Sequence, residues 1–154
     1  MTIKQFKQLE IDRFKADHPT MPYAESFFNS KFKYNDKTAN GLTQMVIRYI
    51  KFIGGQAERI STTGRPIDGT KVFQDAIGRT RMIGSVTWIP GSGRKGSADI
   101  SATIAGRSVK IEVKIGRDRQ SDNQKEYQAE IELAGGIYLI ATSFEQITNQ
   151  IEQI

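Results

Sequence analysis

The fold of this chain is decided by residues 96–114, which read GSADISATIAGRSVKIEVK. Alternate side chains of a β-strand lie on the same face of a sheet. Near the end of the stretch, Glu112 and Lys114 therefore share one face, and the apolar residues around them form the other. Residues 98–104 alternate in the same way, with Asp99 on the polar face. The stretch predicts a β-hairpin with one polar face and one core face.

The turn of this hairpin decides which residues face each other. A two-residue turn at Ala105 and Gly106, or a four-residue turn from Ile104 to Arg107, places Asp99 directly opposite Glu112. A three-residue loop with Gly106 in the left-handed conformation shifts the register by one residue, and Asp99 then faces Ile111. The sequence leaves both registers open.

In the first register, two carboxylates meet on one face of the sheet. Cross-strand neighbours lie roughly 4.5–5.5 Å apart at Cβ, and like charges at that distance repel unless a cation or a proton compensates them. Asp99, Glu112 and Lys114 together are the residue types that metal-dependent phosphodiester cleavage requires. The alternative is a solvated strand face on which Lys114 only neutralises Glu112, since surface ion pairs are common and contribute little.

These residues carry a family resemblance. Asp99, the Glu112-Val113-Lys114 run and the downstream Gln124 resemble the PD-(D/E)XK nuclease superfamily. Lys95-Gly96-x-x-Asp99 before that run resembles its VRR-NUC branch, found in phage and prophage genes. The resemblance covers about residues 40–145 and implies an α/β, restriction-endonuclease-like domain with a central mixed sheet flanked by helices.

The resemblance also implies a site and a reaction. Asp99, Glu112 and the Val113 carbonyl would hold Mg²⁺ or Mn²⁺, and Lys114 would position or deprotonate a water or stabilise charge on the phosphate. The implied activity is an endonuclease acting on nucleic acid, most readily DNA. Many members carry an acid in the first core helix, whereas residues 42–53 contain none and Gln44 is the nearest polar substitute. A nucleic-acid-binding module without turnover is therefore the alternative.

Residues that follow and precede the catalytic pattern are candidates for phosphate contacts. Arg117 and Arg119 come directly after Lys114, and guanidinium groups suit phosphate. Lys95 lies in the loop of residues 90–96, which is rich in glycine and positive charge. Gln124 has two readings: the family resemblance implies that it faces the site and orients substrate or water, whereas Ser121-x-x-Gln124 is also a capping box that explains it structurally.

The remaining segments predict one α/β domain. The pattern indicates a helix over residues 42–53, a strand over 56–62, a loop over 63–69, a strand over 79–89, a helix from Ser121 to 133, a strand over 137–141 and a last helix capped by Ser143. The strand, helix, strand order after residue 107 predicts a crossover and parallel pairing.

Residues 1–39 differ from the predicted nuclease domain of residues 40–154. This N-terminal arm interleaves six lysines with seven aromatic residues, namely Lys4, Lys7, Lys15, Lys31, Lys33 and Lys37 with Phe6, Phe14, Tyr23, Phe27, Phe28, Phe32 and Tyr34. Such a segment can track a phosphate backbone and stack on bases. It can equally pack onto the domain or a second subunit, which leaves an interaction or assembly protein as a third hypothesis.

Composition sets broad limits. The 154 residues fit one domain, and the formal net charge of +5 favours a polyanionic partner without requiring one. The chain has no cysteine and no apolar run near the ~20 residues of a membrane span. We therefore expect a cytoplasmic protein of a bacterium or phage with no membrane partner. Cutting two strands with one site per chain would be simplest for a homodimer.

Overall fold

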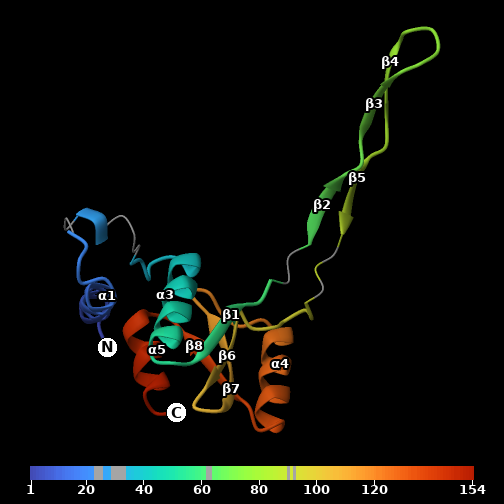
Figure 1. Ribbon diagram of the computed structural model, residues 1–154. Coiled ribbons are helices and arrows are strands. Elements are labelled where there is room, and N and C mark those ends of the chain that lie inside the picture. The colour runs from blue at the N-terminus through green and yellow to red at the C-terminus, as the bar shows by residue number, and fades with distance from the viewer. Residues whose placement is uncertain (23–25, 29–33, 62–63, 90, 92) are drawn as a thin grey trace.

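A computed structural model describes residues 1–22, 26–28, 34–61, 64–89, 91 and 93–154 of this protein. The chain is mixed α/β (Figure 1), as predicted from the sequence. Among the described residues, no helix is both long and apolar enough to cross a lipid bilayer. Four residues named above, Tyr23, Lys31, Phe32 and Lys33, lie outside the described residues, as do residues 62–63, 90 and 92 of the predicted segments.

A mixed four-stranded sheet forms the centre of the domain. Its strands are β1 (Gln56–Arg59), β6 (Ile100–Ile104), β7 (Arg107–Val113) and β8 (Ile137–Ala141), in the order β1-β6-β7-β8. The first two pairs of neighbours are antiparallel, and β7 pairs with β8 in parallel. Helix α4 (Asp122–Leu133) connects the parallel strands. The predicted hairpin, crossover helix and parallel strand are thus confirmed.

The turn between β6 and β7 has two residues. Ile104 pairs with Arg107 and Ile100 pairs with Ile111. Ala105 and Gly106 have φ values of 48° and 77°, the positive values that a type I′ turn requires at both positions. The chain therefore adopts the first of the two predicted registers, even though alanine, unlike glycine, is strained in this conformation.

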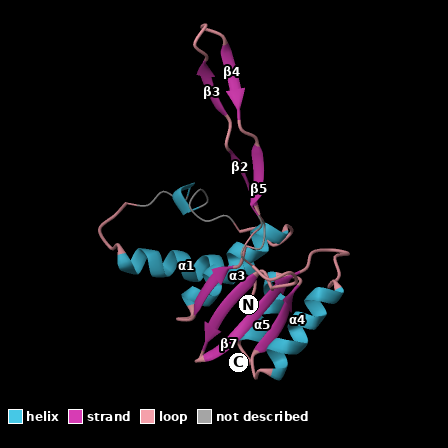
Figure 2. Cartoon of the chain, turned by 90° about the vertical axis from the view of Figure 1, so that its right-hand side faces the viewer, coloured by secondary structure: helices cyan, strands magenta, loops and turns pink. Residues whose placement is uncertain are grey.

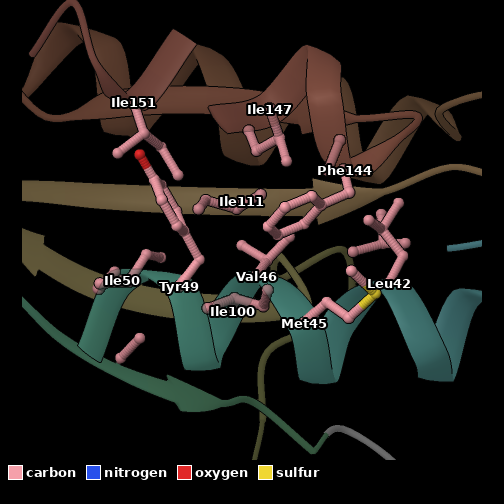
Figure 3. Packing of buried hydrophobic residues seen from close by; sticks show 14 of the residues in the cluster. Leu42, Met45, Val46, Tyr49, Ile50, Ile100, Ile111, Phe144, Ile147 and Ile151 are labelled. Atoms are coloured by element: carbon pink, nitrogen blue, oxygen red, sulfur yellow. The ribbon is translucent and has the colours of Figure 1, made fainter. Parts of the chain in front are cut away.

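Two helices cover one face of the sheet. α3 (Ala39–Phe52) and α5 (Phe144–Ile151) bury their apolar stripes against the inward side chains of β6 and β7, including Ile100 and Ile111 (Figure 3). α3 begins three residues before the predicted start, because the Thr38 side chain accepts a hydrogen bond from Gly41 N and caps the helix. Glu112 of β7 lies on the other face and accepts a hydrogen bond from Gln124 of α4.

Helix α1 (Ile3–Asp17) shares the same core. Phe6 is fully buried, and its ring lies 5.6 Å from Tyr49, 5.6 Å from Phe52 and 5.2 Å from Phe144 between centroids. Such aromatic clusters contribute about 0.5–1.5 kcal/mol per pair beyond area burial. At Phe6, the aromatic residues of the N-terminal arm thus pack onto the domain, which is one of the two readings that the sequence allowed.

The predicted loop over residues 63–69 is wrong, because it contains a strand, and the predicted strand over 79–89 is confirmed only in part, as two strands with a break between them. Between β1 and β6 the chain forms a long hairpin, residues 64–89, which we call the ribbon. Its strands are β2 (Arg65–Asp68), β3 (Lys71–Gln74), β4 (Thr80–Ile83) and β5 (Val86–Ile89). β2 pairs with β5, and β3 pairs with β4. In Figures 1 and 2 the ribbon projects away from the rest of the molecule.

Two glycines explain why the predicted strand is interrupted. Gly84 has φ 92°, and a Cβ at this position would lie 2.2 Å from the carbonyl oxygen of Gly69 in the opposite leg. The two legs therefore approach closely between the β2–β5 and β3–β4 pairs. Only glycine allows both the conformation and the approach.

Candidate active site

The polar face of the hairpin brings three predicted residues together. Glu112 near the end of β7 and Lys114 directly after that strand are buried, with 3% and 8% of their surface exposed. Asp99 directly precedes β6, one residue beyond the Ile100 and Ile111 pair, so the observed register brings it opposite Glu112. The start of α4 closes the site over these strand ends, because Gln124 hydrogen-bonds to Glu112.

The two oxygens of Glu112 differ in their surroundings. Oε1 accepts a 2.5 Å hydrogen bond from Gln124 Nε2 and lies 3.1 Å from Lys114 Nζ. Oε2 is buried and has no hydrogen-bond partner among the described residues. Burial raises the pKa of the Glu112 carboxyl, and the charge of Asp99 raises it further, while Lys114 offsets part of the increase. A buried oxygen without a partner is costly, so Oε2 is suited to receive a ligand.

Lys114 is surrounded by acceptors. Its Nζ donates to Gln124 Oε1 at 3.1 Å and to Asp118 Oδ2 at 3.3 Å, in addition to the contact with Glu112. Burial alone lowers the pKa of this ammonium, but the hydrogen bonds and charges of Glu112 and Asp118 outweigh it, and the pKa of Lys114 is raised. The geometry is that of a charged donor held by three oxygens.

Asp99 is fixed by the backbone of the neighbouring strand. Its Oδ2 accepts a 2.9 Å hydrogen bond from Val113 N, and its own carbonyl oxygen accepts from Ile60 N at 2.8 Å. A carboxylate held by a backbone N–H has little rotamer freedom, because the strand itself is held in the sheet. Asp99 and Glu112 are thus two oriented carboxylates on adjacent strands.

Gln124 caps α4 and also contacts the two charged residues at the end of β7. Its Oε1 accepts from Ser121 N at 2.9 Å, and Ser121 Oγ accepts from Gln124 N, which completes the capping box of α4. The same side chain bridges Glu112 and Lys114. The helix start and the strand end are therefore locked together by one amide group.

Sequence reasoning missed two residues of this site. Asp118 lies four residues after Lys114 and holds its ammonium, and this i, i+4 spacing was the available signal. Tyr138 of β8 is buried opposite Lys110, and its hydroxyl has no hydrogen-bond partner in the described part of the chain. Burial, with the charges of Glu112 and Asp99, raises the pKa of Tyr138 to about 12. No local sequence pattern predicts this position of Tyr138, because only the parallel pairing of β7 and β8 brings it beside Lys110.

The loop before Asp99 is held against α4. Arg94 donates two hydrogen bonds to the Glu130 carboxylate, and a Cβ at Gly96 (φ 85°) would lie 2.4 Å from the Asn123 carbonyl oxygen. Gly96 is therefore required for the loop to approach the start of α4. Neither contact was predicted, because both join residues far apart in the chain.

The predicted phosphate-binding residues lie outside this hydrogen-bonded group. Lys95, Arg117 and Arg119 are exposed, and no hydrogen bond or ion pair joins them to the buried carboxylates within the described ranges. Gln44 is exposed on α3 and likewise shows no hydrogen bond to Asp99 or Glu112 in the residues that the structure describes.

The donor set available to a metal consists of two carboxylates. The described residues contain no group of three or more His, Cys, Asp or Glu side chains that could hold a metal ion. Asp99 and Glu112 nevertheless fit a hard cation, since both offer carboxylate oxygen and Glu112 Oε2 is buried without a partner. Mg²⁺ commonly takes only one or two protein carboxylates and completes its shell with water and substrate oxygens.

Comparison of the sequence with protein-family models gave no match, and comparison with curated proteins gave none.

Proposed function

We propose that this protein is a divalent-metal-dependent endonuclease that hydrolyses phosphodiester bonds, most readily in intracellular DNA. The observation that carries the proposal is the buried, unpartnered Oε2 of Glu112 beside Asp99, with Lys114 and Gln124 on the other oxygen. A structural salt bridge alone would satisfy both oxygens more cheaply, since an unpaired buried acceptor costs roughly 1–3 kcal/mol. The observed arrangement keeps one oxygen free.

Asp99 and Glu112 would hold Mg²⁺ or Mn²⁺, with the Val113 carbonyl as the third protein ligand suggested by the resemblance. A bound ion of this kind polarises a phosphoryl oxygen and lowers the pKa of a bound water. The chain's own contribution is orientation: Val113 N fixes the Asp99 carboxylate, and Gln124 fixes that of Glu112. Such preorganisation lowers the cost of assembling the site during each turnover.

Lys114 acts as a charged hydrogen-bond donor in this proposal. Its three acceptor contacts hold the ammonium at the carboxylate site, where it can stabilise negative charge that develops on the phosphate. Asp118, half of whose side chain is exposed, balances this charge from the solvent side. Removing one such donor from an enzyme typically costs about 10²–10³-fold in rate.

The substrate is assigned from charge and fold. The net charge of +5, together with exposed Lys95, Arg117 and Arg119 on loops that adjoin the site, favours a polyanion. The mixed sheet with helices on both faces supports assignment to the restriction-endonuclease-like folds of the PD-(D/E)XK superfamily. These loop residues are expected to contact the phosphates that flank the scissile bond.

The alternative is a nucleic-acid-binding module without turnover. The exposure of Gln44 and the pairing of only two carboxylates among the described residues favour it. Salt-sensitive binding to DNA without cleavage in any metal is the result expected of such a module.

Cleavage of labelled plasmid, linear duplex, single-stranded and branched DNA, with Mg²⁺, Mn²⁺ or EDTA, tests the proposal. We expect metal-dependent cutting that falls at least 100-fold in Lys114→Ala. Lys110→Ala is the matched control, because Lys110 lies on the same strand and face but donates to Ser101 Oγ instead. Equal cleavage by the Lys114 and Lys110 variants would contradict the assignment.

A further inference from the structure

The ribbon exposes an unusual amount of apolar surface for a soluble β-hairpin. Nine large hydrophobic side chains of residues 64–89 are between 38% and 71% exposed: Ile67, Val72, Phe73, Ile77, Met82, Ile83, Val86, Trp88 and Ile89. All four strands are exposed along their whole length. A two-stranded hairpin with nothing packed on it is marginally stable in water. The ribbon therefore has the properties of a segment that is covered in the working protein.

The exposed area matches what one partner contributes to a stable protein interface. At roughly 100 Å² of apolar surface per large side chain, nine half-exposed side chains leave on the order of 500 Å² uncovered. A standard interface buries about 800 Å² per partner, of which rather more than half is apolar. The ribbon alone can supply this area.

The composition of the exposed ribbon surface favours a protein partner over nucleic acid. It carries four basic and two acidic side chains. Arg81 pairs with Asp75 at 2.8 Å, and Asp75 also accepts from the N–H groups of Ile77 and Arg79, which organises the tip of the hairpin. The other three basic residues have no ion pair among the described residues. The nine exposed apolar side chains outnumber them, and the surface is rich in Ile, Val, Met and aromatic residues, as interface cores are.

The backbone also favours a second copy of this chain as that partner. β2–β5 and β3–β4 are two-stranded sheets, so each described strand has one edge without a pairing strand. Free edges pair readily with other strands. In a two-fold symmetric dimer the same surface meets itself, so the free edges of two ribbons can pair and the apolar side chains beside them are covered together. The ribbon extends clear of the domain in both views, which leaves room for such a meeting (Figures 1 and 2).

We propose that the ribbon of residues 64–89 is a dimerisation element that pairs with the ribbon of a second copy of this chain. This inference goes beyond the proposed nuclease activity and does not depend on it, since dimerisation requires neither metal nor nucleic acid.

Analytical ultracentrifugation without nucleic acid, over a range of protein concentrations, tests the inference. We expect the unmodified protein to sediment as a dimer at micromolar concentration. The double variant Val72→Ser, Met82→Ser removes one exposed cross-strand apolar pair and should raise the dimer dissociation constant at least 100-fold. The control variant Gln74→Ser, Thr80→Ser alters the adjacent polar pair on the same face of the ribbon. It should change the dimer dissociation constant less than fivefold.

A labelling experiment keeps the test valid if serine at these positions melts the hairpin. The chain has no cysteine, so Ile77→Cys at the ribbon tip gives a single spin-labelling site in an otherwise unmodified protein. We expect a defined distance between the labels of two chains, and this distance should disappear when the labelled protein is diluted with unlabelled protein. A monomer at all concentrations would overturn the inference, as would an intermolecular distance that appears only when DNA is added.

Discussion

The four-stranded sheet and the ribbon are both built from short strands, but they bury different amounts of side chain. β6 and β7 alternate inward apolar residues, which are buried, with outward residues. The ribbon strands β2 to β5 are exposed at every position. A packed core therefore stabilises the strand pairing of the four-stranded sheet. In the ribbon, only turns and cross-strand contacts stabilise it. We therefore expect the sheet to determine global stability and the ribbon to open locally.

Matched isoleucines provide the strongest test of this difference. Ile111 is fully buried in β7, and Ile83 in β4 is 54% exposed. Ile111→Ala should lower the free energy of unfolding by about 2–5 kcal/mol, because it removes buried apolar surface and leaves a cavity. Ile83→Ala should lower it by less than about 0.5 kcal/mol at concentrations where the chain is monomeric. Urea denaturation measures both values, and equal losses would show that the ribbon belongs to the cooperative core.

Two glycines with positive φ sharpen the comparison. Gly84→Ala should disrupt strand pairing in the ribbon, because the new Cβ would lie 2.2 Å from the Gly69 carbonyl oxygen. Gly106→Ala meets no atom within 4 Å and should cost only about 1 kcal/mol of backbone strain in the sheet hairpin. Hydrogen exchange should therefore speed up in residues 64–89 of the Gly84 variant and leave β6 and β7 protected. Faster exchange throughout the sheet would contradict the independence of the two regions.

The smallest expected effect concerns the turn that sets the register of the site. Ala105 adopts φ 48°, and asparagine tolerates this conformation better than alanine. Ala105→Asn should raise the free energy of unfolding by about 0.5 kcal/mol, because it removes strain without altering the pairing. A thermal or urea denaturation series detects this change. Destabilisation would indicate that the turn differs from type I′.

The buried elements could be predicted from sequence because burial imposes a period. The hairpin, β8 and α5 carry alternating or helical apolar patterns, and the structure confirms them. α4 buries no residue and could be predicted from its capping box at Ser121 and Gln124 instead. The start of α3 was placed three residues late, since Thr38 precedes the apolar stripe. The ribbon was misread because its strands bury neither face, so their sequence has no alternation to detect.

The same distinction applies to the candidate site. Asp99, Glu112, Lys114 and Gln124 could be grouped from sequence, because one hairpin and one capping box bring them together. Tyr138 and the Arg94 and Glu130 pair could not, since they depend on packing between distant segments. The i, i+4 relation of Asp118 to Lys114 was visible in the sequence and was overlooked.

Metal binding measured by thermal denaturation tests the central claim most directly. At Mg²⁺ about 100-fold above its dissociation constant, the midpoint of the unmodified protein should rise by about 5–10 °C. Glu112→Gln replaces the carboxylate while keeping its size, and should abolish the rise, whereas Lys110→Ala should retain it. An equal rise in Glu112→Gln, or none in the unmodified protein with Mg²⁺ or Mn²⁺, would contradict a metal site at Asp99 and Glu112.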